Sequence, residues 1–300
     1  MQLSQNCNSR YKALVLKFGN DSFEREINSW FRDNDIAVEV IESGKYRGAS
    51  KRLYYLKMLQ RLKCEYGNIK TIVFDDTSLY LYSNIFFSKN YLWLWNTLPQ
   101  TKLEKLRLLL CRNNERVYTF DKNESIKFKL NINTQFFTNK LHYNSEIKQD
   151  IYFVGRDKGR YRIVKSLYDF CSKNGISTLF QLFPDDEKKQ YDCGEIITHS
   201  FIEYNDVINN IAESSVILDL CKNGQTGMTF RAIESLFFNK KIITNNTFYK
   251  SLPFYTPNMI YVIENNDFSG LYEFIKSETV GYDESYRDYY SIEKWLGRFR

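Results

Sequence analysis

The chain of 300 residues is 43% hydrophobic and 17% aromatic, which is enough apolar material for one large or two medium domains and excludes a disordered chain. Its formal charge of +6 comes from the first half, because residues 1–148 hold 24 Lys and Arg against 15 Asp and Glu, whereas residues 149–300 hold 18 against 21. No signal-peptide core and no run of about 18 apolar residues occurs, so we expect a cytoplasmic protein.

Apolar, β-branched and aromatic runs alternate with helical segments along the first half, a pattern typical of parallel sheets built from βαβ units. The expected strands are residues 12–18, 37–42, 70–76, 91–96 and 116–121. The expected helices are residues 21–33, 48–65 and 101–112.

The same alternation continues in the second half. Strands are expected at residues 150–155, 177–183, 195–200, 215–220, 241–244 and 259–264, and helices at 158–173, 206–213, 228–238 and 268–276. The pattern therefore predicts two tandem Rossmann-like α/β domains, residues 1–148 and 149–300, that face a central cleft. We expect the ligands to bind in this cleft, because ligands of open α/β sheets bind beyond the carboxyl ends of the strands. In the last segment, 290–299, Trp295 and Phe299 share one helical face, which predicts a terminal helix that docks back onto the protein.

The six cysteines stand singly, without a CxxC pair or a neighbouring histidine cluster. This spacing indicates reduced thiols rather than a disulfide framework or a zinc site. We expect no metal and no cofactor.

Two glycine-containing turns precede helices in the second half. The first, "VGRDKGR" at 154–160, places three cations and two glycines after a strand; its candidate residues are Gly155, Arg156, Lys158 and Arg160. The second, "GQTGMT" at 224–229, opens a helix; its candidate residues are Gln225, Thr226, Gly227 and Thr229. Free N–H groups and the helix dipole at such turns favour an anion, most often a phosphate, although a capped helix start with nothing bound is the more common structure.

Glu234 follows the second turn by one helical turn, and Arg231, a further candidate for contact with the ligand, lies three residues before it. The apolar residues of this helix occupy another face, so we expect Glu234 to lie off the core and within reach of a ligand hydroxyl. An ordinary i, i+3 ion pair with Arg231 is an equally good interpretation. His199, at the end of an expected strand, is a further candidate for contact with the ligand, or simply a strand end.

Three aspartates of the first half are candidates for a catalytic base. Asp75 and Asp76 in "FDDTS" end an expected strand, and Asp121 ends another. Aspartates at such positions more often cap the next helix. Trp93 and Trp95 alternate along one strand, where aromatic residues either build a sugar site or, more often, fill the core.

Several of these stretches resemble a family of bacterial glycosyltransferases of the GT-B fold that act in lipopolysaccharide and capsule assembly. The resemblance runs through "YTFD" (118–121), "NTQFF" (133–137), "FVGRDKGR" (153–160), "GQTGMTFRAIESLFFNKKIITNN" (224–246) and "YSIEKWLGRF" (290–299). It covers the second half well and the first half in patches, where it does not identify the base.

The resemblance implies a transferase that moves a sugar from a nucleotide-sugar to an oligosaccharide or lipid-linked glycan. Thr226, Gly227 and Thr229 would contact the donor diphosphate, and Glu234 its ribose or sugar. Arg156, Lys158 and Arg160 would neutralise the leaving group without a metal. We expect the basic first half to bind the anionic inner leaflet of the membrane, so that the protein associates with the membrane peripherally.

Three alternatives stay open at this point. A polyol-phosphate transferase of similar architecture would release a nucleoside monophosphate. A basic nucleic-acid-binding protein would use the charge of the first half, but no recognition-module signature occurs and the cations are dispersed, so no nucleic-acid partner is expected. A catalytically inactive scaffold is the third.

Overall fold

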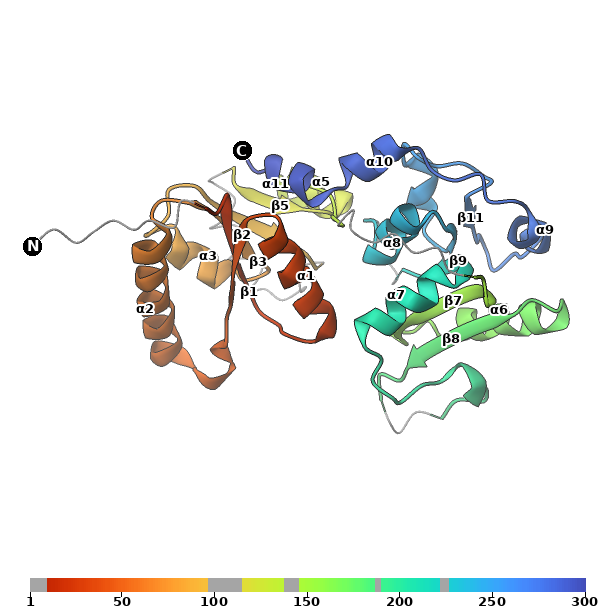
Figure 1. The fold of residues 1–300 in the computed structure, drawn as a ribbon. Helices are drawn as coiled ribbons and strands as arrows, with labels where there is room; N and C mark the ends of the chain where they lie inside the picture. Colours follow the sequence, from red (N-terminus) through yellow and green to blue (C-terminus); the bar gives the residue numbers. More distant parts are fainter. Residues whose placement is uncertain (1–9, 97–114, 138–145, 187–189, 222–226) are drawn as a thin grey trace, which may run out of the picture. The chain divides into compact units, whose positions relative to one another are not determined.

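The computed structural model describes residues 10–96, 115–137, 146–186, 190–221 and 227–300. The chain forms two compact units (Figure 1). Unit 1 comprises Met1–Thr134 and Ile292–Arg300, and unit 2 comprises Gln135–Ser291. None of the helices in these ranges is long and apolar enough to span a bilayer.

Unit 1 is built on a six-stranded parallel sheet. Its strands are β1 (Ala13–Lys17), β2 (Ile36–Val40), β3 (Lys70–Phe74), β4 (Asn90–Leu94), β5 (Val117–Thr119) and β6 (Asn131–Ile132), in the order β2-β1-β3-β4-β5-β6. β1, β3 and β4 are almost continuously apolar, as expected for parallel strands that are covered on both faces.

One face of this sheet is covered by α2 (Gly48–Tyr66) and α3 (Thr77–Ser83). Tyr55, Leu59 and Leu62 of α2 pack with Leu14 and Val73 of the sheet in one buried cluster. The short helices η1 (Ser43–Lys45) and α5 (Lys122–Phe128) lie in the connections that follow β2 and β5.

The opposite face of the sheet is covered by α1 (Ser22–Asp33) and by α11 (Ile292–Gly297), which is the last helix of the chain. Trp295 of α11 is fully buried and its ring contacts Phe31 of α1 and Phe74 and Trp93 of the sheet. The predicted docking of the terminal helix is therefore confirmed, and its partner is the first sheet.

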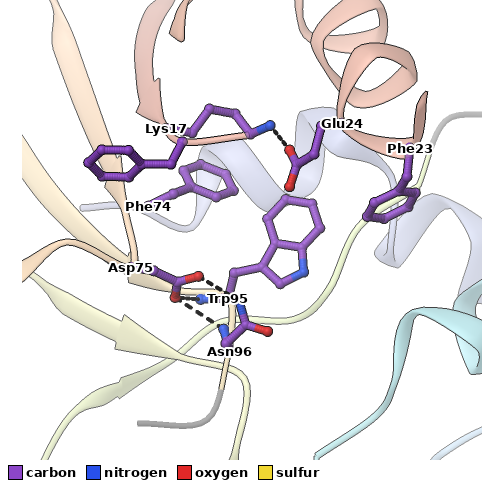
Figure 2. Close-up of a pocket in the computed structure, with 8 residues that line it drawn as sticks. Lys17, Phe23, Glu24, Phe74, Asp75, Trp95 and Asn96 are labelled. Carbon is purple, nitrogen blue, oxygen red and sulfur yellow. Dashed lines mark hydrogen bonds and ion pairs between the residues drawn. The ribbon is translucent and has the colours of Figure 1, made fainter. Parts of the chain in front are cut away.

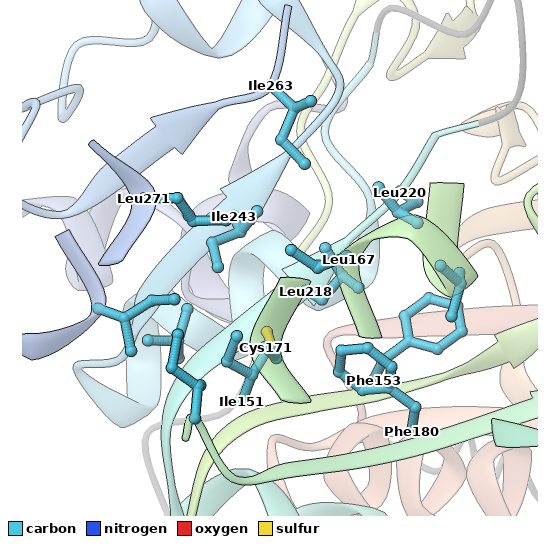
Figure 3. Packing of buried hydrophobic residues seen from close by; sticks show 14 of the residues in the cluster. Ile151, Phe153, Leu167, Cys171, Phe180, Leu218, Leu220, Ile243, Ile263 and Leu271 are labelled. Atoms are coloured by element: carbon cyan, nitrogen blue, oxygen red, sulfur yellow. The ribbon is translucent and has the colours of Figure 1, made fainter. Parts of the chain in front are cut away.

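Unit 2 is built on a five-stranded parallel sheet. Its strands are β7 (Gln149–Arg156), β8 (Thr178–Phe183), β9 (Ser214–Asp219), β10 (Lys241–Thr244) and β11 (Ile260–Val262), in the order β11-β10-β9-β7-β8. One face packs on α6 (Tyr161–Lys173) and α9 (Leu271–Lys276); Figure 3 shows Leu167 and Cys171 of α6 against Ile151, Phe153 and Leu218 of the sheet.

The other face of this sheet carries α7 (Tyr204–Ala212) and α8 (Phe230–Phe238), with α10 (Glu284–Tyr289) against α8. Two short helices, η3 (Gly194–Ile196) and η4 (Thr247–Ser251), lie in the loops after β8 and β10. Each unit is thus a three-layer α/β domain with its own core, as the alternating pattern predicts.

The structure contradicts two sequence predictions, and a third lies outside the residues that it describes. Residues 195–200 form no strand: η3 occupies their start, and a single bridge joins Ile197 to Leu182. The domain boundary at residue 148 differs from the structure, because 135–148 belong to unit 2 and 292–300 return to unit 1, where Trp295 is buried. The helix predicted at 101–112 lies outside the described residues.

Candidate functional site

Each sheet has a point at which the chain changes direction across it, and ligands of open α/β sheets bind at such points. In unit 2 the chain runs from β7 to β8 on one side and returns to β9 on the other. The carboxyl ends of β7 and β9 are followed by the two glycine-containing turns of the sequence. The first motif and the described end of the second, 227–229, therefore follow the two strands that flank the switch point of this sheet.

Arg160 holds the turn after β7 in place. Its guanidinium donates to the carbonyl oxygens of Leu220 at 2.8 Å and of Asp157 at 3.2 Å, and also to that of Arg156. The carboxylate of the fully buried Asp157 accepts from the backbone N–H of Tyr161, in the first turn of α6, and from the Tyr191 hydroxyl. Arg160 therefore links the ends of β7 and β9 through backbone carbonyls.

Gly155 makes room for this guanidinium. A Cβ atom at this position would lie 2.9 Å from Nη2 of Arg160, closer than real Cβ contacts come. Three and four positions further along, Lys158 has a φ of 43° and Gly159 a φ of 81°, so the turn passes through left-handed backbone. The sequence prediction that glycines permit a tight turn is confirmed for Gly159, whereas Gly155 serves close packing.

The N-terminus of α8 is anchored to the end of β9. Thr229 is the N-cap of α8, and its hydroxyl accepts from the Ala232 N–H at 3.3 Å and donates to Oδ1 of Asp219 at 2.8 Å. The Tyr249 hydroxyl donates to Oδ2 of Asp219 at 2.6 Å. Burial raises the pKa of Asp219, and the hydrogen bonds from Tyr249 and Thr229 oppose that rise.

Glu234 lies deeper in α8 than the sequence predicts. It is fully buried, its Oε2 pairs with the Arg231 guanidinium, and its Oε1 accepts a 2.7 Å hydrogen bond from the Tyr204 hydroxyl of α7. Burial raises the pKa of Glu234, against the effect of Arg231. The expectation that Glu234 lies off the core is wrong, because α7 packs on this flank of α8, whereas the i, i+3 ion pair is confirmed.

The remaining predicted donor-site residues lie near the surface or outside the described residues. Arg156 and Lys158 are exposed at the carboxyl end of β7. His199 is exposed in a loop rather than at a strand end, because residues 195–200 form no strand. Gly227 is buried just before α8, and Gln225 and Thr226 fall outside the described residues.

The sheet of unit 1 has its own switch point, between β1 and β3. A pocket with a volume of about 190 Å³ opens there (Figure 2). It is lined by Lys17, Phe18, Phe23, Glu24, Phe74, Asp75, Trp95 and Asn96, which follow or end β1, β3 and β4 or begin α1.

Asp75 is the one of the three candidate aspartates that lines this pocket. It has a φ of 54°, its Oδ1 accepts from the backbone N–H groups of Trp95 at 2.7 Å and Asn96 at 3.1 Å, and its Oδ2 accepts from the Asn96 side chain at 2.7 Å. The residue is exposed at the rim, yet the surrounding protein desolvates its carboxylate and raises its pKa. These bonds also explain why β4 ends at Leu94, short of the prediction.

Asp76 and Asp121 cap helices. Oδ1 of Asp76 accepts from Leu79 N–H at 2.6 Å at the start of α3, and Oδ1 of Asp121 accepts from Glu124 N–H at 3.0 Å at the start of α5. The capping interpretation of the sequence is therefore confirmed for both, and a role for either as a base stays a prediction.

Lys17 and Glu24 are site residues that sequence reasoning missed. Lys17 ends β1 with only 1% of its surface exposed and forms an ion pair with Glu24 in the first turn of α1. Burial lowers the pKa of Lys17 to about 8. The signal available in the sequence was a lysine at the end of an otherwise apolar strand. Among the residues that the structure describes, no group of three His, Cys, Asp or Glu side chains is arranged to hold a metal ion, and metal independence stays a prediction.

No known family profile matches the chain, and no curated protein matches it in sequence. Among solved structures, it is similar to an alpha-glucosyltransferase in complex with UDP and a 13-mer DNA containing a central A:G mismatch, at a TM-score of 0.58 and 13% identity over 97% of this chain and 96% of that chain. It is also similar to the UDP-GlcNAc 2-epimerase of Methanocaldococcus jannaschii, at a TM-score of 0.46 and 10% identity over 95% and 98% of the two chains. The second likeness is too distant to support an argument, and the first shows the fold. The chain therefore has two parallel-sheet α/β domains of the GT-B type.

Proposed function

We propose that the protein transfers a sugar from a nucleoside-diphosphate sugar to a glycan. The observation that supports this most is the switch point of unit 2, where two cations, Arg156 and Lys158, stand exposed beside the N-terminal turn of α6 and the capped start of α8 follows β9. Helix N-termini and cations together bind phosphate groups. UDP is the first nucleotide to test, because the similar alpha-glucosyltransferase is in complex with UDP.

In the proposed reaction, an acceptor hydroxyl oxygen forms a bond to the anomeric carbon of the donor sugar. The bond from that carbon to the diphosphate oxygen breaks, its electron pair leaves with the nucleoside diphosphate, and the hydroxyl proton passes to a base. Arg156 and Lys158 would stabilise the charge on the departing diphosphate, which is electrostatic catalysis without a metal. Asp75, with its raised pKa, is the candidate base that lines a pocket.

The acceptor that we propose is an oligosaccharide or lipid-linked glycan of a lipopolysaccharide or capsule at the inner membrane surface. α2 supports the membrane part: its residues 48–66 hold five Lys and Arg against one Glu, and Arg52, Leu53 and Lys57 are exposed on it. Basic residues near an anionic bilayer contribute about 1 kcal/mol each, and an exposed Leu adds apolar contact. Flotation with phosphatidylglycerol vesicles should therefore fall for Arg52→Ala/Lys57→Ala, and an unchanged flotation would contradict the membrane contact.

Donor binding is tested by titrating the full chain with UDP in a calorimeter, with and without EDTA. Arg156→Ala and Lys158→Ala should each weaken UDP by about tenfold, because each removes a charge-assisted phosphate contact. Lys173→Ala removes an equally exposed cation at the far end of α6 and is the matched control. Equal affinity for UDP in all three variants would contradict the contacts of Arg156 and Lys158 with the diphosphate. Loss of UDP binding in EDTA would contradict metal independence.

The released nucleotide separates sugar transfer from its nearest rival. UDP-glucose and other nucleotide-sugars, offered with lipid-linked glycan extracts, should yield a nucleoside diphosphate and a glycan enlarged by one sugar. A nucleoside monophosphate with a phosphodiester product would instead show polyol-phosphate transfer. Duplex DNA is the acceptor control, since the similar alpha-glucosyltransferase is in complex with DNA; glucosylated DNA would overturn the glycan assignment.

A further inference from the structure

The pocket at the switch point of unit 1 has the size of a single ring. Its volume of about 190 Å³ is below the roughly 300–1,000 Å³ of sites for drug-sized ligands. This volume suits one ring-sized group, such as a pyranose unit, rather than an oligosaccharide or a whole nucleotide. Its place beyond the carboxyl ends of β1, β3 and β4 is where ligands of parallel sheets bind.

Trp95 gives the pocket an apolar wall. Its ring centroid lies 5.2 Å from that of Phe74, which is buried in the sheet, and 6.0 Å from that of Phe23 in α1. Figure 2 shows the indole between these two rings, with the Asp75 carboxylate on one side of it and Lys17 and Glu24 on the other. The electron-rich face of an indole attracts the C–H face of a sugar ring, so a wall fixed in this way suits a pyranose.

Asp75 and Asn96 give the pocket a polar rim. The Asp75 carboxylate accepts three hydrogen bonds, from two backbone N–H groups and the Asn96 amide. A carboxylate has about four acceptor positions, so Asp75 retains capacity for one hydroxyl of a ligand. Its left-handed φ of 54° is held by those same bonds, which fixes the carboxylate before any ligand arrives.

The described lining residues carry one net negative charge. Among them Lys17 is the one cation, and the Glu24 carboxylate pairs with that ammonium group. Lys17 is buried, so it does not swing out to meet a ligand anion. The Asp75 carboxylate then remains without a balancing cation, and a second carboxylate in the pocket would face it as a like charge.

We infer that this pocket is a subsite for one uncharged sugar ring, stacked on Trp95 and hydrogen-bonded to Asp75, and that it rejects acidic sugars. The inference rests on the proposed function in one respect, that the bound ring is the acceptor sugar of the glycan. The pocket selects sugars by their charge: a neutral hexose enters, whereas the carboxylate of a uronic acid is repelled by Asp75 and finds Lys17 already paired with Glu24.

The test is ligand-observed NMR on the full chain with methyl β-glucopyranoside and methyl β-glucuronide, without any nucleotide. Saturation transfer should reach the neutral glycoside, and the acidic one should bind about tenfold more weakly. Trp95→Ala should abolish transfer to the neutral glycoside. Equal binding of both glycosides, or binding of the neutral one to Trp95→Ala at full strength, would overturn the inference.

Removing the negative charge of the pocket gives a sharper test of the selection between the two glycosides. Asp75→Asn raises the pocket charge by one unit and leaves the Lys17–Glu24 ion pair in place, so it should raise the affinity for the glucuronide relative to the glucopyranoside by about tenfold. Asp35→Asn makes the same charge change just before the first residue of β2, at the amino ends of the strands, whereas the pocket lies at their carboxyl ends. Asn tolerates the left-handed backbone of this position, and the substitution should leave the ratio unchanged.

Failure of this inference and failure of the proposed function give different results. If UDP binds and neither glycoside does, the donor site stands and the pocket is not a sugar subsite. If the glucopyranoside binds selectively and no nucleotide does, the pocket is a sugar site in a protein with another activity. Each variant should keep the melting temperature of the wild type, which shows that the compared chains are folded.

Discussion

The hydroxyl of Tyr204 on α7 donates a 2.7 Å hydrogen bond to the carboxylate of Glu234 on α8. Glu234 is fully buried and its other oxygen pairs with Arg231, so two helices and one ion pair are joined at a single carboxylate. A substitution at Glu234 therefore tests stability before it tests ligand binding.

Glu234→Ala should lower the free energy of unfolding by about 3–5 kcal/mol, because it leaves the largely buried Arg231 without its partner. Tyr204→Phe should cost about 1–3 kcal/mol, since the buried carboxylate loses one donor. Urea unfolding measures both, with Tyr272→Phe on the exposed side of α9 as the control. An undiminished stability of Glu234→Ala would show that Glu234 is not buried and would restore its direct contact with a donor sugar as the simpler interpretation.

Gly155→Ala should displace the Arg160 guanidinium, because the added Cβ would lie 2.9 Å from Nη2. We expect a loss of about 1–3 kcal/mol of stability, typical of overpacking, together with weaker UDP binding as the turn after β7 shifts. Gly194→Ala is the matched control, because nothing lies within 4 Å of its added Cβ atom. Equal stability and UDP affinity in the two variants would show that Arg160 does not need the space at Gly155.

The buried Lys17 predicts a pH dependence of stability. Its pKa is lowered from 10.5 to about 8 in the folded chain, so between these values the unfolded chain binds one more proton than the folded chain. Stability should therefore rise with pH from about 8 to about 10.5, by up to about 1.4 kcal/mol per pH unit. The difference in unfolding free energy between the wild type and Lys17→Met isolates this contribution, with the exposed Lys12→Met as control. A difference that is flat over this range would contradict the lowered pKa.

The periodicity of the sequence predicted both sheets and most of their helices, because strands covered on both faces are continuous apolar runs and the helices between them keep one apolar face. It failed at residues 195–200, where "EIITHS" has the composition of a strand but only Ile197 pairs with the sheet. A strand needs a neighbour along its length, and local composition does not reveal whether one is present.

The sequence predicted only the local parts of the candidate site, because it shows turns and helix starts but not which strands are neighbours. The turns after β7 and β9 are local motifs, and the parallel topology puts the carboxyl ends of these two strands side by side. By contrast, Asp75 and Trp95 come together across 20 residues only because β3 pairs with β4, and Arg160 reaches Leu220 only because β7 lies beside β9. Strand order decides these contacts, and the sequence pattern leaves strand order open.

The return of the terminal helix to unit 1 gives the last prediction. Trp295 is fully buried against Phe31, Phe74 and Trp93, and the Lys70 ammonium donates to the carbonyl of Phe299 at 2.9 Å. Trp295→Ala should therefore cost about 3–5 kcal/mol, through lost burial and the cavity left behind. Tyr289→Ala, an exposed aromatic position three residues before α11, is the control for loss of a ring. Because Phe74 also lines the pocket of unit 1, Trp295→Ala should weaken glycoside binding while UDP binding by unit 2 persists; loss of UDP binding alone would show that the helix supports the other unit instead.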